Sequence, residues 1–397
     1  MGNECSFSQH SRREISCPPA KLDSPIHTVR LSPEYEMDDA FTNHFRSLHQ
    51  VFMYITDQCN LRCKQCLYKP TISQYPNLEI GLIDALALLR SFRRLGASKV
   101  TFLGGEPTLY GRRQLGSPLF DLIEGTKKIG YEYIRLDTNG LNTPNFMKHP
   151  TFSRLSELAF SLDGPTPKIN DSLRGKGTFK KTLDSINLAV GLGYFVTITC
   201  CIHNGLLKRG NDGILLIEKM INFAQDLGAQ IINFHDLFKV GVPMDSWTGS
   251  FAPSVEEWLP VYKLLSEKID HKQFSIPVRL PRCFVEKSEF IRNAKYYGYC
   301  PAKLGERIMV HPNGVIRICS NLICTAFGVA HYHQRKIVWD YSINNELSGH
   351  DGTQYTRCTN RSRNRTYSNL VPLCFSFKPG QKEYVWQHEL KWEQRRR

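Results

Sequence analysis

The sequence predicts an α/β fold, a partial (β/α)6 barrel of the TIM-like kind with a small C-terminal extension. Six short β-rich runs alternate with helical patterns between residues 50 and 237, and such alternation builds a parallel sheet with right-handed crossovers. The strands are almost continuously apolar, which is typical of a sheet covered by helices. Short polar motifs follow the strands, at the edge where α/β barrels place their sites.

The expected elements follow one another in a regular order. Strands are expected at "VFMYI" and over residues 99–105, 133–140, 158–164, 194–202 and 230–237. Helices are expected over residues 82–96, 118–130, 178–193 and 213–228, and each pattern closes on a glycine, as a helix commonly does. Within the first helix, Leu82, Leu86 and Leu89 recur near helical spacing. The motifs at the strand ends read "GGEP", "DTNG", "SLDGP" and "CIHNG".

The residues outside this alternation divide into three regions. Residues 1–48 are polar and irregular and are expected to form an extended arm before a core at 49–250. Residues 251–299 are expected to be a helical connector, and residues 300–397 a small separate domain. In that domain "RIMVHPNGVIRIC" predicts a β-hairpin with a tight turn at its Asn-Gly pair. The chain beyond it has weak periodicity, so its folding needs something other than hydrophobic burial.

The composition is that of a soluble globular protein, with 41% apolar and 22% charged residues. No apolar run is long enough to span a bilayer and the N-terminus lacks a signal-peptide core, so a cytoplasmic location is expected. In that compartment the 13 cysteines favour metal ligation over disulfides. Residues 301–397 carry 15 Lys and Arg against 7 Asp and Glu. This excess suits an acidic or phosphorylated partner or a solvated face, while nucleic-acid binding is disfavoured because aromatic residues are not interleaved.

Three cysteines stand in "TDQCNLRCKQC", on a polar loop directly after the first strand. They are Cys59, Cys63 and Cys66. Three thiolates on one loop can each bind one iron of a [4Fe–4S] cluster and leave the fourth iron open for another ligand. Zinc usually takes four ligands, and a redox pair needs Cys-x-x-Cys in a different context. Spacing alone favours the open cluster and leaves zinc, a redox pair and a chance grouping as alternatives.

The joint order of the motifs resembles the radical S-adenosylmethionine (radical SAM) superfamily over roughly residues 50–240. The matching features are Cys-x3-Cys-x2-Cys after the first strand, "GGEP" after the second, "TNG" after the third, "SLDGPTPKINDSLRGKGTF", and Asn204 after the fifth. The resemblance implies a [4Fe–4S] cluster on the three cysteines and SAM chelated to its open iron. It also implies an electron donor such as flavodoxin or ferredoxin.

The resemblance also implies roles for individual residues. Gly104 and Gly105 would let the backbone approach SAM, Glu106 would help to receive its ammonium group, and Pro107 would fix the turn. Arg174 would pair with the SAM carboxylate, with a surface salt bridge as its alternative role. Ribose or substrate hydroxyls would be bound by Asn139, Ser161, Asp163 and Asn204. The last two are equally expected as caps of strand ends.

One position departs from the family pattern. Members commonly carry an aromatic residue just before the third cysteine, near the adenine, and this chain has Gln65 there. The adenine contact would then come from elsewhere, such as Tyr68 or Phe234. The adjacent Cys200 and Cys201 point to opposite faces of a strand and are expected in the core rather than as ligands.

A second cysteine group, from Cys300 to Cys319, resembles the start of a SPASM or twitch extension. The denser cysteine run of a full SPASM domain does not follow, so the resemblance implies one auxiliary [4Fe–4S] cluster. Its ligands would be Cys300, Cys319, Cys358 and Cys374. Cys324 or Cys283 could replace either of the last two. Metal binding would then supply folding free energy to the weakly apolar C-terminal region.

These features predict an iron–sulfur oxidoreductase or maturase of the radical SAM type. Such an enzyme cleaves SAM reductively to a 5′-deoxyadenosyl radical, which abstracts hydrogen from the substrate. The expected substrate is a ribosomally synthesised peptide natural product, matured by crosslinking, dehydrogenation or epimerisation. The alternative is dehydrogenation, epimerisation or decarboxylation of a sugar, aminoglycoside or nucleoside antibiotic intermediate. A non-catalytic redox sensor is disfavoured because it would need no SAM site.

Overall fold

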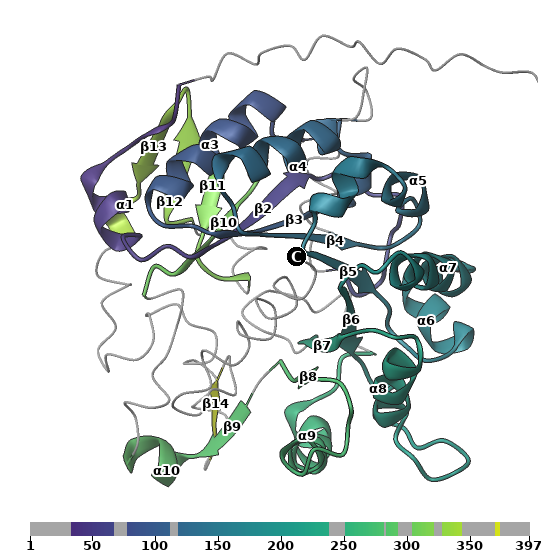
Figure 1. The fold of residues 1–397 in the computed structure, drawn as a ribbon. Helices are drawn as coiled ribbons and strands as arrows, with labels where there is room; N and C mark the ends of the chain where they lie inside the picture. Colours follow the sequence, from purple (N-terminus) through teal and green to yellow (C-terminus); the bar gives the residue numbers. More distant parts are fainter. Residues whose placement is uncertain are drawn as a thin grey trace, which may run out of the picture. The chain divides into compact units, whose positions relative to one another are not determined.

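The computed structural model describes residues 33–66, 78–111, 118–237, 251–281, 283–292, 304–320, 328–343 and 370–373. One sheet of twelve strands runs through them in the order β1-β13-β12-β11-β10-β2-β3-β4-β5-β6-β7-β8 (Figure 1). Its centre consists of six parallel neighbours, namely β2 (Gln50–Thr56), β3 (Lys99–Gly104), β4 (Tyr133–Thr138), β5 (Glu157–Ser161), β6 (Val196–Ile202) and β7 (Ile231–Asp236). The sheet ends at β1 and β8 without closing, which confirms the predicted partial α/β barrel.

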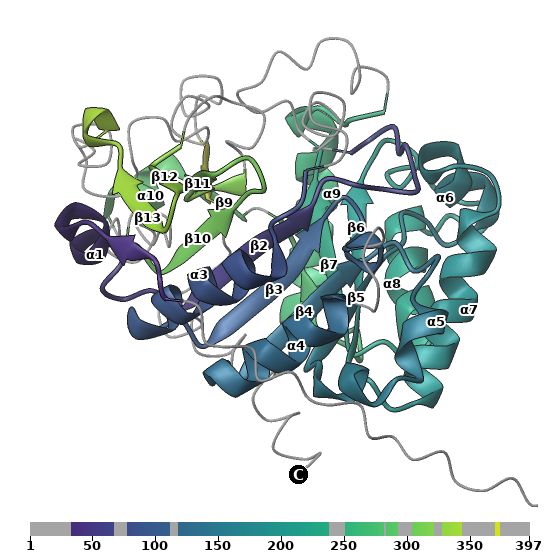
Figure 2. The same ribbon diagram turned by 90° about the horizontal axis from the view of Figure 1, so that it is seen from above.

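Helices cover one face of this sheet, as Figures 1 and 2 show. The long ones are α3 (Leu82–Arg94), α4 (Pro118–Ile129), α7 (Thr178–Gly191), α8 (Leu216–Asp226) and α9 (Val255–Asp270). Shorter segments are α5 (Pro144–Met147), α6 (Pro167–Arg174), η1 (Pro107–Leu109) and η2 (Pro150–Arg154). Strand residues such as Phe102, Leu136 and Phe160 point to the helices and are fully buried in the main hydrophobic core. The predicted helices over the core are thereby confirmed.

The other face of the strands is polar at their amino ends, although the sequence suggested nearly continuous apolar strands. Glu157 is fully buried and accepts hydrogen bonds from Tyr133 Oη at 2.8 Å and Arg135 Nη1 at 2.9 Å. Arg135 Nε also lies 2.5 Å from Asp137 Oδ1, and Lys99 Nζ lies 4.5 Å from the centre of the Tyr133 ring. We call this group the ionic layer; it fills the interior of the partial barrel at the amino ends of β3, β4 and β5.

The C-terminal region extends the same sheet. β10 (Arg307–Val310) pairs in parallel with β2 and in antiparallel with β11 (Val315–Arg317), so the predicted hairpin is present. Gly314 in its turn has φ of 83°, a conformation that favours glycine. The sheet continues through β12 (Ala330–His333) and β13 (Lys336–Trp339), and η4 (Tyr341–Ile343) follows. The expected domain boundary at residue 300 is therefore not marked by a break in the sheet.

The remaining described elements lie at the two ends of the chain order. β1 (Glu36–Met37) and α1 (Asp39–His44) form within the range expected to be an extended arm, and Phe41 and Phe45 are fully buried in the core. After α9 come β8 (Val278–Arg279), β9 (Cys283–Glu286) and α10 (Lys287–Arg292), and β9 pairs with β14 (Leu370–Leu373) in a separate two-stranded sheet. No helix among the described residues is both long and apolar enough to cross a membrane.

Removing the Glu157 carboxylate should destabilise the fold. Burial alone would raise the pKa of Glu157, but the charges of Arg135 and Lys99 outweigh it and lower the pKa. A lowered pKa means that the stabilisation is present at neutral pH and is lost as pH falls through the folded-state pKa. We expect Glu157→Ala to reduce the free energy of unfolding at pH 7 by about 3 kcal/mol, measured by urea denaturation.

A matched control is Asp184→Ala, which removes an exposed carboxylate from the Lys180–Asp184 pair on α7. Its effect should stay below about 0.5 kcal/mol. Equal losses in the two variants at pH 7, or a Glu157→Ala loss that does not shrink on acidification, would contradict the role given to the ionic layer.

Candidate functional site

The three cysteines lie on the segment that follows β2, residues 57–66, which we call the cysteine loop. Cys59, Cys63 and Cys66 are partly exposed and are not joined in disulfides. The loop turns on itself, since the Leu61 N–H donates to Cys59 Sγ at 3.4 Å and the Cys66 N–H donates to Cys63 O at 3.3 Å. Burial raises the pKa of Cys59 to about 11 and also raises that of Cys63. Binding a metal there must therefore release protons.

The end of β3 holds the start of this loop by main-chain hydrogen bonds. The Gly105 N–H donates to Thr56 O at 2.7 Å and the Glu106 N–H donates to Gln58 O at 2.6 Å. A Cβ atom on Gly104 would lie 2.2 Å from Thr56 O, and one on Gly105 would lie 2.1 Å from Gln58 O. The two glycines were expected to admit a ligand. Among the described residues, the atoms closest to these two glycines belong to the backbone that leads into the cysteine loop.

Glu106 joins the ends of β3 and β4. Its side chain is fully buried, with Oε1 accepting from Thr108 Oγ1 at 2.7 Å and Thr138 Oγ1 at 2.8 Å, and Oε2 accepting from the Asn139 N–H at 2.7 Å. Burial raises the pKa of Glu106, and these donors offset part of the shift. Pro107 is buried as the first residue of η1. The described contacts of Glu106 thus position strand ends.

Asn139 connects the end of β4 to the cysteine loop. Its Nδ2 donates to Asn60 Oδ1 at 2.7 Å, its Oδ1 accepts from the Leu141 N–H at 3.0 Å, and its carbonyl accepts from Thr182 Oγ1 at 2.9 Å. The side chain is buried, and both of its polar groups are hydrogen-bonded to protein. The structure therefore brings Asn139 to the cysteine loop, between Cys59 and Leu61.

Asp163 and Arg174 form a buried ion pair at the ends of β5 and α6. Asp163 is fully buried, and its Oδ2 lies 2.5 Å from Arg174 Nε. Burial alone would lower the pKa of Arg174, but the Asp163 carboxylate outweighs it and raises the pKa. Asp163 Oδ1 also accepts from the Cys201 N–H at 2.7 Å. The interpretation of Arg174 as a surface salt bridge is therefore wrong, while the interpretation of Asp163 as a strand-end cap fits its contacts.

Gln65 belongs to this site although sequence reasoning gave it no role beyond its departure from the family pattern. It is 3% exposed, and its Nε2 donates to Asp163 Oδ2 at 2.5 Å. The neighbouring Lys64 N–H donates to Leu173 O at 2.9 Å. The cysteine loop is thus held from both ends, by β3 near Cys59 and by Asp163 and α6 near Cys66.

Other expected residues are placed as follows. Ser161 is partly exposed at the end of β5, and the Asn204 N–H donates to Phe251 O at 2.8 Å. Cys200 is fully buried in the core as expected, while Cys201 is on the other face of β6 beside Asp163. Phe234 is 1% exposed in the helix-side core, so the suggestion that it contacts adenine is wrong. Tyr68 lies outside the described residues.

The auxiliary cluster stays a prediction. Cys319 is a buried free thiol just after β11. The other three expected ligands lie outside the described residues; they are Cys300, Cys358 and Cys374. Of the two alternative ligands, Cys324 also lies outside them, and the side chain of Cys283 is not described. Within the described ranges no three His, Cys, Asp or Glu side chains converge as a ready-made metal site.

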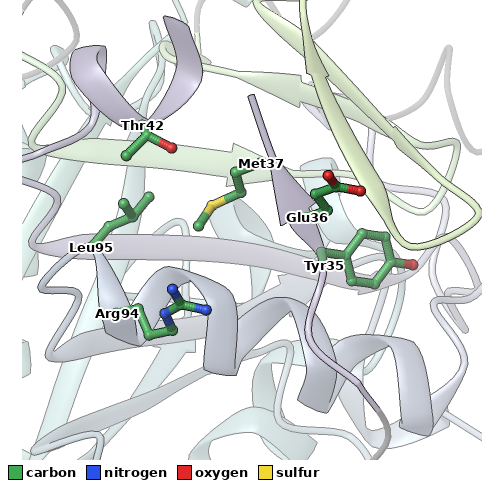
Figure 3. A pocket seen from close by; sticks show the side chains of 6 residues that line it. All are labelled: Tyr35, Glu36, Met37, Thr42, Arg94 and Leu95. Carbon is green, nitrogen blue, oxygen red and sulfur yellow. The ribbon is translucent and has the colours of Figure 1, made fainter. Parts of the chain in front are cut away.

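A surface hollow lies away from this site. Figure 3 shows its lining, which consists of Tyr35, Glu36, Met37, Thr42, Arg94 and Leu95. These residues come from the start of the described chain, α1 and the last turn of α3, whereas the cysteine loop follows the carboxyl end of β2. Arg94 is paired with Glu34 at 2.7 Å. The hollow contains none of the expected site residues.

Together, an open parallel sheet and a thiol-bearing loop at its carboxyl edge define an α/β protein with a site built from strand ends. Residues 53–210, which hold most of these strand ends, match the family model of the radical SAM superfamily. The chain therefore carries a radical SAM domain, as the motifs predicted.

Curated relatives match part of this chain. GTP 3',8-cyclase of Limosilactobacillus fermentum is 29% identical over 208 residues, which cover 52% of this chain and 59% of the relative. Molybdenum cofactor biosynthesis protein 1 of Homo sapiens is 30% identical over 156 residues, which cover 38% of this chain and 23% of the relative. The chain thus spans less than two thirds of the length of both.

Two groups of solved structures share the fold at low sequence identity. Streptococcus suis SuiB bound to precursor peptide SuiA superposes with a TM-score of 0.54 at 16% identity, over 73% of this chain and 63% of that one. The enzyme anSMEcpe with bound AdoMet and the Cp18Cys peptide gives a TM-score of 0.51 at 16% identity, over 72% and 77% of the two chains. These likenesses confirm the fold.

The residues present fit the [4Fe–4S] cluster and SAM that the family implies. Thiolates are the ligands that iron–sulfur clusters use, and this loop carries three partly accessible cysteines within eight residues. Both ends of the loop are anchored while the sulfur atoms have no disulfide partner. Cys59, Cys63 and Cys66 would hold the cluster. The Gly104–Pro107 turn lies next to the start of the cysteine loop.

We expect Gly105→Ala to disturb the cysteine loop, because its new Cβ would overlap Gln58 O. The free energy of unfolding should fall by about 1–3 kcal/mol, and iron bound after anaerobic reconstitution should fall with it. Gly191→Ala on α7 is the control, since a Cβ there meets nothing within 4 Å. That variant should be neutral or stabilised by up to about 1 kcal/mol. Equal behaviour of the two variants would argue against a close approach at Gly105.

Proposed function

We propose that this protein is a radical SAM enzyme whose cluster is held by Cys59, Cys63 and Cys66. The observation that carries the proposal is the anchoring of a loop with three cysteines beside the Gly104–Pro107 turn. When bound, the cluster and SAM supply reductive SAM cleavage and a 5′-deoxyadenosyl radical that abstracts hydrogen from substrate. An external one-electron donor such as flavodoxin or ferredoxin completes the proposed cycle.

The residues of this chain position the reactants in this proposal. The Gly104–Gly105 turn fixes where the cysteine loop starts, and the buried Glu106 fixes that turn against β4. Arg174 is held by Asp163 beside Cys63 and would supply positive charge near the SAM carboxylate. Asn139 contributes little free hydrogen-bonding capacity, because its amide groups are already bonded to Asn60 and Leu141.

The interior face of the sheet near its carboxyl edge offers polar groups to a substrate. Ser161, Thr199 and Asn233 are register neighbours on β5, β6 and β7, and we call them the polar row. They alternate along each strand with core residues such as Phe160 and Ile198, so they face away from the helices. Thr199 Oγ1 is buried and has no hydrogen-bond partner within the described ranges. A polar substrate group would satisfy it.

For the substrate we propose a ribosomally made peptide, modified by crosslinking, dehydrogenation or epimerisation. Support comes from the fold, which is shared with solved structures that contain a bound peptide, namely precursor peptide SuiA in SuiB and the Cp18Cys peptide in anSMEcpe. Amide groups of a peptide backbone match the polar row. An auxiliary [4Fe–4S] cluster on Cys300, Cys319, Cys358 and Cys374 belongs to the same proposal, and would bind the substrate or accept an electron from it.

The second candidate substrate is a nucleotide or nucleoside. The curated GTP 3',8-cyclase is 29% identical to this chain over 208 residues. On the same face Arg279 of β8 is the register neighbour of Asn233, so a cationic residue lies next to the polar row. Either substrate is compatible with the proposed hydrogen abstraction.

Replacing Cys59, Cys63 and Cys66 together by Ala should abolish 5′-deoxyadenosine formation from SAM and dithionite under anaerobic conditions. Reconstituted wild-type chain should bind more than about four irons if the auxiliary cluster exists, and the triple variant should lose about four of them. Cys200→Ala, which alters only a core cysteine, should retain both properties. Turnover by the triple variant would disprove the radical proposal, and four or fewer irons in the wild type would disprove the auxiliary cluster.

The two substrate candidates can be separated by substrate-stimulated SAM cleavage. A true substrate should increase 5′-deoxyadenosine formation and, if deuterated at the attacked carbon, transfer deuterium to it. One arm uses GTP, and the other uses the peptide encoded by any short reading frame next to the gene. Stimulation and deuterium transfer in the GTP arm alone would reject the peptide proposal.

A further inference from the structure

Gln65 occupies an unusual place for an amide side chain. It lies between two proposed cluster ligands, with Cys66 following it and Cys63 two residues before it, and it is 3% exposed. Its Nε2 donates to Asp163 Oδ2, 98 positions away in the chain. Its Oε1 is buried without a hydrogen-bond partner in the described part of the chain. The Asp163 contact is therefore the polar interaction that fixes this side chain.

Asp163 can serve as an anchor because it is itself fixed from several sides. The Arg174 guanidinium and the Cys201 N–H contact its carboxylate, its own N–H donates to Asn170 Oδ1 at 3.0 Å, and its carbonyl contacts His203 Nε2 at 2.8 Å. These partners come from α6 and from the end of β6. Gln65 Nε2 and Arg174 Nε contact the same Oδ2 atom, so the two nitrogens are no more than about 5 Å apart.

We propose that Gln65 is a positioning residue that docks the cysteine loop onto the Asp163–Arg174 ion pair. It thereby sets where Cys63 and Cys66 stand when the cluster binds. The inference rests on the proposed function in so far as these cysteines are cluster ligands. Mutation of residues that orient metal ligands without binding the metal themselves often changes metal affinity by about 10- to 100-fold.

The docking contact allows a charge-exchange test. Gln65→Glu places two carboxylates at the 2.5 Å contact, so one must take up a proton or move away. Asp163→Asn leaves the buried Arg174 guanidinium without its carboxylate. In the double variant Gln65→Glu/Asp163→Asn, the new amide donates to the new carboxylate and Arg174 again has an anion within reach. Lys64→Ala is the matched control, because Lys64 is exposed and adjacent to Gln65.

The first measurement is amide hydrogen exchange of the full chain before iron is added. The reporters are the N–H groups of Leu61, Lys64 and Cys66, whose acceptors are Cys59 Sγ, Leu173 O and Cys63 O. Each single variant should exchange faster than wild type at these amides, and the double variant should recover most of the protection. Exchange rates in the single variants that equal those of wild type would overturn the proposal. So would a double variant whose loss of amide protection equals the sum of the losses in the two single variants.

The second measurement is iron retention against a chelator and the EPR spectrum of the reduced cluster with and without SAM. Each single variant should lose iron about tenfold faster or more, with recovery in the double variant and no change in Lys64→Ala. Failure of the wild type to bind iron would refute the proposed function, and hydrogen exchange would still decide the role of Gln65. Normal iron retention and an unaltered EPR response to SAM in both single variants would refute the positioning role alone.

Discussion

The close approach of two backbones at the carboxyl edge is the constraint on which the rest of the site depends. The end of β3 bonds the carbonyls of Thr56 and Gln58 through two consecutive N–H groups, at 2.7 and 2.6 Å. No side chain fits between them, which accounts for Gly104 and Gly105. Because main-chain bonds do not depend on rotamers, Cys59 follows directly after a rigidly placed residue. The second anchor, at Gln65, is a side-chain contact and is therefore the more easily changed of the two.

Two buried carboxylates connect the ends of neighbouring strands by hydrogen bonds. Glu106 ties the end of β3 to that of β4, and Asp163 ties the end of β5 to that of β6. A buried carboxylate is costly unless donors and counter-charges satisfy it. Among the described residues Glu106 receives hydroxyl and backbone donors, and burial raises its pKa, while Asp163 has the guanidinium of Arg174. The edge is thus preorganised by groups that need not touch a ligand themselves.

Much of the fold could be predicted because its signals are local. Apolar runs and glycine stops predict the six central strands and their helices, and the Asn-Gly pair predicts the β10–β11 hairpin. The pairing of β10 with β2 could not be predicted, since it joins residues about 250 positions apart and leaves no periodic signal. The contact between Gln65 and Asp163 could not be predicted either, because these residues are 98 positions apart in the chain. One signal was available and missed: the alternation of Tyr133, Arg135 and Asp137 with apolar residues in "YIRLDT" indicates a polar interior face.

The polarity of that interior face differs between its two ends, and this difference bears on how a substrate would bind. At the amino ends the ionic layer is internally paired and its members Tyr133, Arg135 and Glu157 are buried. Toward the carboxyl edge the polar row includes Thr199, whose hydroxyl has no partner in the described ranges. A bound molecule would gain little from the satisfied layer and more from the row. A radical formed at the cysteine loop would therefore lie near a substrate bound at the same edge of the sheet. The ionic layer would lie at the opposite end of the strands.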